Sequence, residues 1–370
     1  MKYSQHTFEK YPTCTVHAAS FYPNQSPSGA EHHLIFTLSA KEDLMAAKEN
    51  CIAVMHACIE EWLAQEPYQK ATCVFARYFL KNSAELRPQV HARRMFPAPC
   101  ALSFIEQPPA NNSTLVVWLY LQEPEAFSEK YTHFWTTEKF HLGENVAQQT
   151  KKLLTDYQQW LQAKGCHMKD HCMRTWFFIS NIDVNYPAFA KTRTDYFREI
   201  GMDETTHYIA STGIEGENGA PGSYVTMDAY AVKGLNPSQV THLQALTHLS
   251  PTNMYGVTFE RGVALQFDDR KHIYISGTAS IDAKGNVVEE GNVRGQTLRM
   301  WENVEVLLSA ANATWNNVAQ IIVYLRHQSD LSLVRALFKN RFPDIPTVIV
   351  MGKVCRPAWL IEMECIAIMP

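Results

Sequence analysis

The chain has 370 residues, of which 46% are hydrophobic and 19% are charged, and its formal net charge at pH 7 is −4. This composition is typical of a folded globular protein of two or three domains, and it excludes a disordered or fibrous chain. There is no basic stripe that would bind nucleic acid, no signal-peptide pattern, and no apolar run of the roughly 18–20 residues that cross a membrane. The nine cysteines follow no disulfide framework, so we expect a cytoplasmic protein with reduced thiols.

The first third of the chain alternates between patterns typical of strands and patterns typical of helices. Short β-branched and aromatic runs predict strands, and apolar residues at helical spacing predict helices. In chain order, the predicted elements are a strand at 33–38, a helix at 44–63, a strand at 72–80, a short helix at 86–94, and strands at 101–106 and 114–121.

The same order of elements recurs in the rest of the chain. In the middle third we predict a helix at 145–161, a strand at 174–180, a helix at 187–200, and strands at 207–211 and 223–232. In the last third we predict a strand at 272–276, a helix at 292–310, a strand at 318–325, a helix at 331–342, and strands at 347–351 and 359–368.

This repetition predicts an α+β fold of three related units in one chain, each a sheet with two helices on one face. Joining segments are expected near 122–144 and 233–254, because the second of these is rich in turn residues. We therefore place the units at residues 1–125, 126–235 and 236–370.

Two carboxylates, Glu362 and Glu364, lie two residues apart in the last predicted strand. Strand geometry directs both to the same face, among apolar neighbours. A carboxyl group in such a dry setting has a raised pKa and can act as a general acid near neutral pH. The alternative is a strand face in contact with water. Cys355 precedes this strand and can face the same cavity, or it can be a small buried thiol.

Other side chains suggest recognition of a small acid. Arg174 and Arg261 are candidates for bidentate binding of carboxylates, or for surface ion pairs. Gly213 follows a predicted strand, where a glycine lets a ligand approach the backbone or forms a bulge. Residues 166–172 contain two cysteines and two histidines, but their compact spacing does not fit a zinc site, and we expect no metal.

The chain lacks the sequence motifs of several large enzyme classes. It has no GxSxG, no Walker A motif, no GxGxxG and no HExxH. This argues against acyl transfer by a nucleophile elbow, against nucleotide hydrolysis and against zinc-protease chemistry.

Five segments in order resemble one protein family. They are Arg174-Thr-Trp-Phe-Phe178, Ser211-Thr-Gly-Ile214, Phe259-Glu-Arg261, Ser276-Gly-Thr-Ala-Ser-Ile281, and Cys355-Arg356 ahead of Glu362-Met-Glu364. They resemble the Rid/YjgF family, formerly labelled endoribonuclease L-PSP, and within it the chorismatase branch. The resemblance implies chorismate-mutase-like units that form a pseudo-trimer, with the site in the cleft between the middle and last units. Residues 1–125 resemble this branch only through the repeat, as a degenerate unit.

The resemblance implies an enzyme that hydrolyses the enol ether of chorismate, or of a similar small dicarboxylate, and releases pyruvate. Glu362 would be the acid, with Cys355 beside it, and Arg261 and Arg174 would hold the two carboxylates. The other substrate-binding positions implied are Gly213, Ala279 and Tyr255. No metal or organic cofactor is required. The partner is a small carboxylate, not nucleic acid or a membrane, and the chain is a monomer with an internal pseudo-threefold arrangement or a homo-oligomer.

The product and the exact activity stay open at this point. Cys355 resembles the branch members that make a hydroxybenzoate, whereas Ala279 resembles those that make a cyclohexadiene diol carboxylate. A Rid-type imine or enamine deaminase is an alternative, although Val348 stands where those enzymes carry a carboxylate-binding arginine. A tyrosine usual in chorismatases is also absent, because that strand ends in Phe177-Phe178. A non-catalytic binder of a small acidic metabolite is the third possibility.

Overall fold

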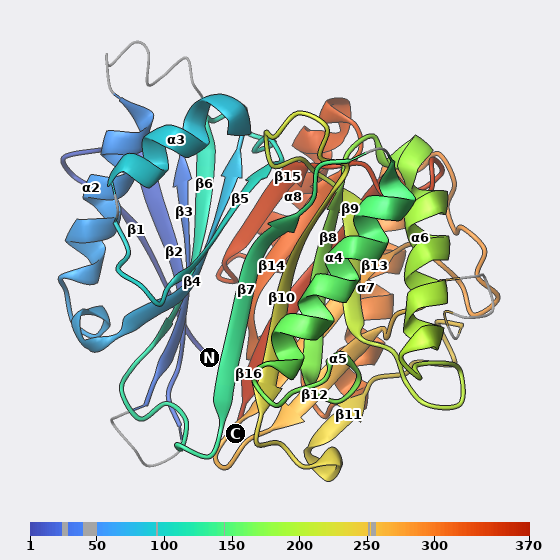
Figure 1. Cartoon of the computed structure of the whole chain (residues 1–370). Coiled ribbons are helices and arrows are strands. Elements are labelled where there is room, and N and C mark those ends of the chain that lie inside the picture. The colour runs from blue at the N-terminus through green and yellow to red at the C-terminus, as the bar shows by residue number, and fades with distance from the viewer. Residues whose placement is uncertain (24–28, 40–49, 94, 144, 251, 253–256) are drawn as a thin grey trace.

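Three β-sheets form the framework of the chain, with helices on their outer faces (Figure 1). The computed structural model describes residues 1–23, 29–39, 50–93, 95–143, 145–250, 252 and 257–370. None of the helices in this described part is long and apolar enough to cross a membrane.

The first sheet has six strands in the order β1-β2-β3-β6-β4-β5. Their bounds are β1 Lys2–Thr7, β2 Cys14–Phe21, β3 Glu31–Leu38, β4 Thr72–Leu80, β5 Ala101–Glu106 and β6 Leu115–Gln122. Helices α2 (Cys51–Leu63) and α3 (Ser83–Arg93) pack on one face. Asn50 begins α2 by accepting a hydrogen bond from the Ala53 amide, and the predicted helical residues before position 50 lie outside the described residues.

The second sheet has four strands in the order β7-β10-β8-β9. They are β7 (Thr132–Phe140), β8 (Cys172–Ile179), β9 (Ala210–Glu215) and β10 (Val225–Lys233), and the helices are α4 (Val146–Gln162), α5 (Met168–His171) and α6 (Ile182–Glu199). The prediction of a joining segment at 122–144 is wrong, because β7 lies within it. Its residues are mostly half-buried and lack the apolar alternation that reveals a strand.

The third sheet has six strands in the order β11-β12-β13-β16-β14-β15. They are β11 (Val240–His242), β12 (Gly262–Gln266), β13 (Lys271–Ala279), β14 (Val318–Leu325), β15 (Thr347–Met351) and β16 (Ile361–Met369), and its helices are α7 (Val293–Ala310) and α8 (Leu331–Arg341). The short strand β11 lies inside the joining segment that we predicted at 233–254.

A common pattern runs through the three sheets. Each contains four strands in an equivalent order: β3-β6-β4-β5, β7-β10-β8-β9 and β13-β16-β14-β15. Each also has a helix between its second and third strands along the chain, namely α3, α6 and α8. The prediction of an α+β chain of three related units is confirmed, with two long helices per unit (α2 and α3, α4 and α6, α7 and α8) and the short α5 added in the second. The first and third sheets add two further strands each, β1 with β2 and β11 with β12.

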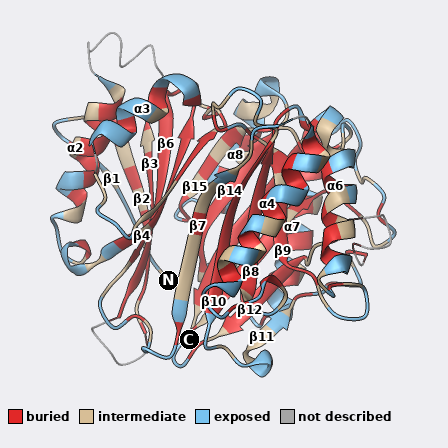
Figure 2. Cartoon of the chain, in the orientation of Figure 1, coloured by how far each residue is buried: buried red, intermediate tan, exposed pale blue. Residues whose placement is uncertain are grey.

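The sheets face one another across a buried interior (Figure 2). Each unit supplies one buried arginine that pairs with a carboxylate of another sheet: Arg77 on β4 with Asp228, Arg174 on β8 with Glu364, and Arg270 in the β12–β13 turn with Glu31. The nitrogen–oxygen distances are 2.8, 2.8 and 2.7 Å. Since removing one partner would leave an uncompensated buried charge, these pairs fix which sheets meet.

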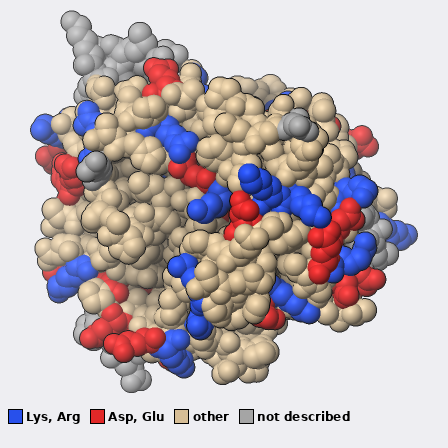
Figure 3. All heavy atoms as spheres, viewed as in Figure 1, with Lys and Arg blue, Asp and Glu red and all other residues tan. Residues whose placement is uncertain are grey.

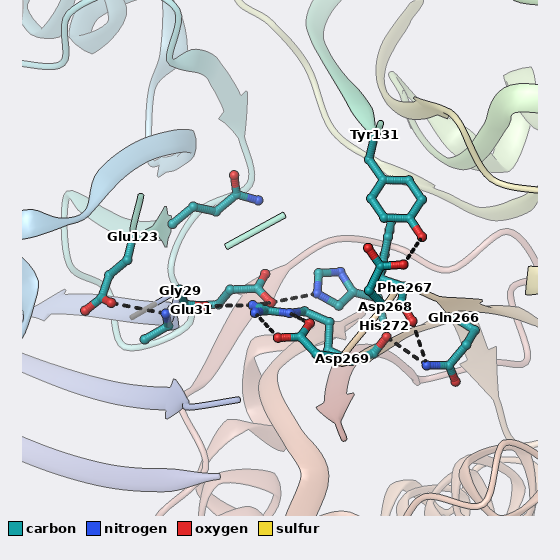
Figure 4. Close-up of polar contacts among 12 residues, drawn as sticks. Gly29, Glu31, Glu123, Tyr131, Gln266, Phe267, Asp268, Asp269 and His272 are labelled. Atoms are coloured by element: carbon teal, nitrogen blue, oxygen red, sulfur yellow. Dashed lines mark hydrogen bonds and ion pairs between the residues drawn. The ribbon is translucent and has the colours of Figure 1, made fainter. Parts of the chain in front are cut away.

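The third of these pairs is part of a larger polar network (Figure 4). Glu31 on β3 also contacts His272 at 3.0 Å and accepts a hydrogen bond from the Tyr120 hydroxyl. Interactions with His272, then with Arg270, and the hydrogen bond from Tyr120 hold the pKa of Glu31 well below its usual value despite complete burial. On the outer surface, acidic and basic side chains are interspersed over the face in Figure 3.

Candidate functional site

A cavity lies between the second and third sheets, in the cleft that the sequence predicted for the site. The second sheet and its helix α6 contribute Tyr186, Arg193, Ser211 and Gly213. The third unit contributes Arg261, Gly277, Ala279, Cys355 and Glu362 among its lining residues. The enclosed space is about 40 Å³, and a larger surface groove of about 520 Å³ shares Tyr186 and Cys355 with it.

Glu362 on β16 is the acidic group of this cavity. It is buried and pairs across the sheet with Ala279 on β13 and Tyr324 on β14. Burial, and secondarily the negative charge of Glu364, raise the pKa of Glu362 to about 8, against the opposing effects of Arg174 and Arg261. At neutral pH the Glu362 side chain is therefore mainly a carboxylic acid, which can donate a proton.

Gly277 makes room for this acid. A Cβ atom at position 277 would lie 2.2 Å from Oε1 of Glu362, far inside contact distance. The Gly277 amide itself donates to the hydroxyl of Thr212 at 2.9 Å. Because Gly277 has no side chain, the Glu362 acid can approach the backbone of β13 closely at this point.

Arg174 does not line the cavity, although the sequence assigned it to the substrate. Its guanidinium donates to Glu364 at 2.8 Å and to the Thr175 carbonyl at 3.0 Å. Glu364 also accepts from the indole N–H of Trp176 at 2.7 Å. Arg174 is therefore paired within the protein and is not available to a substrate. The sequence could not show this pairing, because Glu364 is 190 positions away along the chain.

Arg193 on α6 is the cation that sequence reasoning missed. It is fully buried and lines the cavity, and its Nε and Nη2 have no hydrogen-bond partner among the described residues. The Tyr186 hydroxyl bonds to this guanidinium, but burying its two remaining donor atoms without partners is costly, so Arg193 is able to bind an anionic group. The available signal was its position in α6, where it follows the buried Phe189 and precedes the buried Phe197, each at a spacing of four.

Cys355 and Tyr186 lie together at one side of the cavity. The Tyr186 hydroxyl hydrogen-bonds with the Cys355 sulfur, and burial, with the nearby Glu362, raises the pKa of the Cys355 thiol to about 12. The thiol is thus uncharged at neutral pH, so it can shape the cavity or donate weakly but is a poor nucleophile. Tyr186 also supplies a hydroxyl to the site, whereas Phe177 and Phe178 do not.

The remaining predicted residues divide into two groups. Gly213, Arg261 and Ala279 line the cavity, and Arg261 is buried and donates to the Ser250 carbonyl at 3.2 Å. Tyr255 lies outside the described residues.

Within the described part of the chain, no three His, Cys, Asp or Glu side chains are grouped so that they could hold a metal ion. In the segment that contains two cysteines and two histidines, Cys166 and Cys172 are buried and His167 is exposed. These residues are part of the turn and strand start around α5 rather than a ligand cluster.

The arrangement has a definite chemical capacity. A neutral carboxylic acid, two buried guanidinium groups and a hydroxyl face one small cavity between two units. The guanidinium groups can hold an anion, and the acid can protonate it at a fixed position.

The sequence and the fold of this chain are similar to those of several known proteins. The family described as "Endoribonuclease L-PSP" matches residues 263–369. A RutC family protein of Pyrococcus abyssi is 31% identical over 97 residues, which are 26% of this chain and 76% of that protein. A chorismatase of Streptomyces rapamycinicus is 27% identical over 214 residues, covering 52% of this chain and 62% of its own length. A crystal structure of a chorismatase shares the fold, with a TM-score of 0.62 and 19% identity over 80% of this chain and 93% of that one.

Proposed function

The chain belongs to the Rid/YjgF superfamily, and from that premise we propose that it is a chorismatase-like hydrolase of an enol ether. The substrate would be chorismate or a similar small dicarboxylate that carries an enolpyruvyl group. The named chorismatase relatives support this choice, and the observation that carries it is the protonated Glu362 in a cavity with two arginines.

The first step uses Glu362 as the acid. Its proton goes to the terminal methylene carbon of the enolpyruvyl group, whose π electrons form the new C–H bond. The ether carbon becomes an oxocarbenium ion, and a dry pocket favours a neutral acid that can supply the proton. Glu362 is left as a carboxylate next to the cation that it has created.

The second step is the addition of water. Water attacks the oxocarbenium carbon and passes a proton to the Glu362 carboxylate, which restores the acid. The resulting hemiketal collapses as its hydroxyl proton is transferred to the ether oxygen and the bond between the hemiketal carbon and that oxygen breaks, so that the oxygen stays on the ring. The products are pyruvate and the ring alcohol, and one water molecule is consumed.

Arg193 and Arg261 would orient the substrate by binding its two carboxylates. In this proposal Arg193 has the role that the sequence assigned to Arg174, because Arg174 is paired with Glu364. Because the enclosed space is small, part of the ligand would extend along the α6 groove past Tyr186 and Cys355. The subsequent fate of the ring, diol or hydroxybenzoate, would depend on groups there, with Cys355 the leading one.

The test is incubation of the purified chain with chorismate. Pyruvate is followed with lactate dehydrogenase and NADH, and the ring product is identified by mass spectrometry and chromatography against both product types. We expect pyruvate and one ring product in equal amounts. Binding of chorismate without pyruvate release would support the non-catalytic binder instead, and absence of both would refute the proposal.

A further inference from the structure

The repeated architecture creates a second cleft, between the first and third sheets, that is built like the candidate site. In the candidate site, α6 and β9 of one unit face β13 and β16 of another. In the second cleft, the equivalent elements α8 and β15 face β3 and β6, and the added strands β1 and β2 contribute Gln5, Thr15 and His17 to the same wall. Figure 1 shows α8 and β15 next to the first sheet. We define the second cleft by Thr37, Val116, Arg335, Phe338, Lys339 and Val348, which all line it.

The three equivalent clefts have different contents. Between the first and second sheets, ion pairs occupy the cleft: Arg87 on α3 pairs with Glu138 at 2.9 Å, and Arg77 pairs with Asp228 at 2.8 Å. The candidate site holds the acid Glu362. The second cleft instead contains a cavity of about 390 Å³, a volume that lies within the usual range of small-molecule sites.

The lining of the second cleft specifies the kind of ligand. Arg335 and Lys339 lie one helical turn apart on α8, and none of the described residues that line the cavity is a carboxylate. Asp344 acts electrostatically on His17, another residue that lines the cavity, but is not itself among the lining residues. Phe338 and Val348 are buried and supply an apolar wall. Two cations over an apolar wall match a carboxylate attached to a flat ring.

We propose that the second cleft binds a small aromatic or cyclic carboxylate and does not react with it. The absence of an acid among the described lining residues means that no group there corresponds to Glu362. Binding would join α8 to the first sheet, so occupancy would be linked to how the first and third units pack. This proposal does not depend on the proposed function, because it concerns binding at a different cleft and needs no turnover.

The experiment uses 4-fluorobenzoate as the probe and fluorine NMR titration of the full chain. All titrations are repeated in an Arg193→Ala background, so that binding at the candidate site is weakened. The test variant is Arg335→Ala with Lys339→Ala, at two exposed positions where folding is expected to be retained. The matched control is Lys152→Ala with Arg294→Ala, which removes two exposed cations outside both clefts.

We expect 4-fluorobenzoate to bind in the Arg193→Ala background, with affinity reduced at least about tenfold by the Arg335/Lys339 change and less than twofold by the control. A third variant, Thr37→Phe, fills the cavity and keeps both cations, and it should also abolish binding. Unchanged affinity in the Arg335/Lys339 variant would overturn the proposal. Binding that needs the two cations but survives a folded Thr37→Phe variant would overturn it too, because it would reflect general attraction to a basic surface.

Discussion

Glu362 and Glu364 lie on one face of β16, two residues apart, but Glu364 forms a buried ion pair whereas Glu362 faces the cavity. Glu364 is paired with Arg174 at 2.8 Å and accepts a hydrogen bond from Trp176 at 2.7 Å. Glu362 faces the cavity, and the charge of Glu364 adds to burial in raising its pKa to about 8. The structural ion pair therefore also serves the acid, since a fixed negative charge nearby disfavours loss of its proton.

Replacement of the acid is the most direct test of its role. Glu362→Gln keeps the shape of the side chain but cannot donate the proton, so we expect kcat for pyruvate release to fall about 10²–10⁴-fold. The Kd for chorismate should change little, because the two arginines remain. Pyruvate assays and calorimetric titration measure the two quantities, with Glu290→Gln at an exposed position as the control. Wild-type turnover by Glu362→Gln would refute the assignment.

The pH dependence of the reaction follows from the same pKa. Because the protonated form of Glu362 is the active one, kcat/KM should be constant below pH about 8 and fall as the pH rises through that value. A rate profile from pH 6 to 10 measures this, with circular dichroism at each pH to show that the protein stays folded. A rate that rises across this range would mean that the active group is a base.

The two arginines should respond differently to substitution. Arg193→Ala removes a cavity cation, so we expect KM to rise at least about tenfold without loss of stability in urea. Arg174→Leu breaks a buried pair and should cost about 3–5 kcal/mol of unfolding free energy. Adding Glu364→Leu to Arg174→Leu should restore part of that stability, because it removes the unpaired charge. If the Arg174→Leu variant were as stable as the wild type but had a raised KM, Arg174 would be a substrate-binding residue and not a structural one.

Cys355 is expected to affect which product forms rather than whether pyruvate is released. Its thiol is uncharged at neutral pH and hydrogen-bonded to Tyr186, so it is not the group assigned to donate the proton in the first step. Cys355→Ala should therefore retain a substantial rate of pyruvate release and shift the ratio of hydroxybenzoate to diol, measured by chromatography. Complete loss of pyruvate release in a folded Cys355→Ala would place the thiol in the first step.

The repeat was visible in the sequence because its central strands and helices carry strong periodic patterns. β4, β5, β14 and β15 coincide with their predicted ranges. The missed strands include β1, most of which is exposed, and β7, which is half-buried along most of its length, but also the mostly buried β2 and β12. Edge strands bury little apolar surface, so pairing with a neighbour, not their own pattern, defines them.

The site shows the same division between local and distant information. Glu362 and Glu364 are recognisable because strand alternation is local. Two features depend on how the second sheet packs against the third. They are the ion pair between Arg174 and Glu364 and the position of Arg193 at the cavity. Such contacts between residues far apart along the chain cannot be obtained from spacing.

Acid sensitivity of the whole fold is the final prediction. Burial lowers the pKa of His32 to about 4, of His33 to about 3 and of His133 to about 4, whereas an unfolded histidine titrates near 6.5. Between pH 6.5 and about 4 the unfolded chain therefore takes up protons that the folded chain does not, so the stability present above pH 6.5 is lost as the pH falls. Each histidine contributes up to about 1.4 kcal/mol per pH unit in this window. Urea unfolding at pH 7, 6, 5 and 4.5 should show this decline, with a shallower slope for His33→Gln and an unchanged slope for His327→Gln at an exposed position. If His33→Gln declined as steeply as the wild type, burial of that histidine would not be a source of the acid sensitivity.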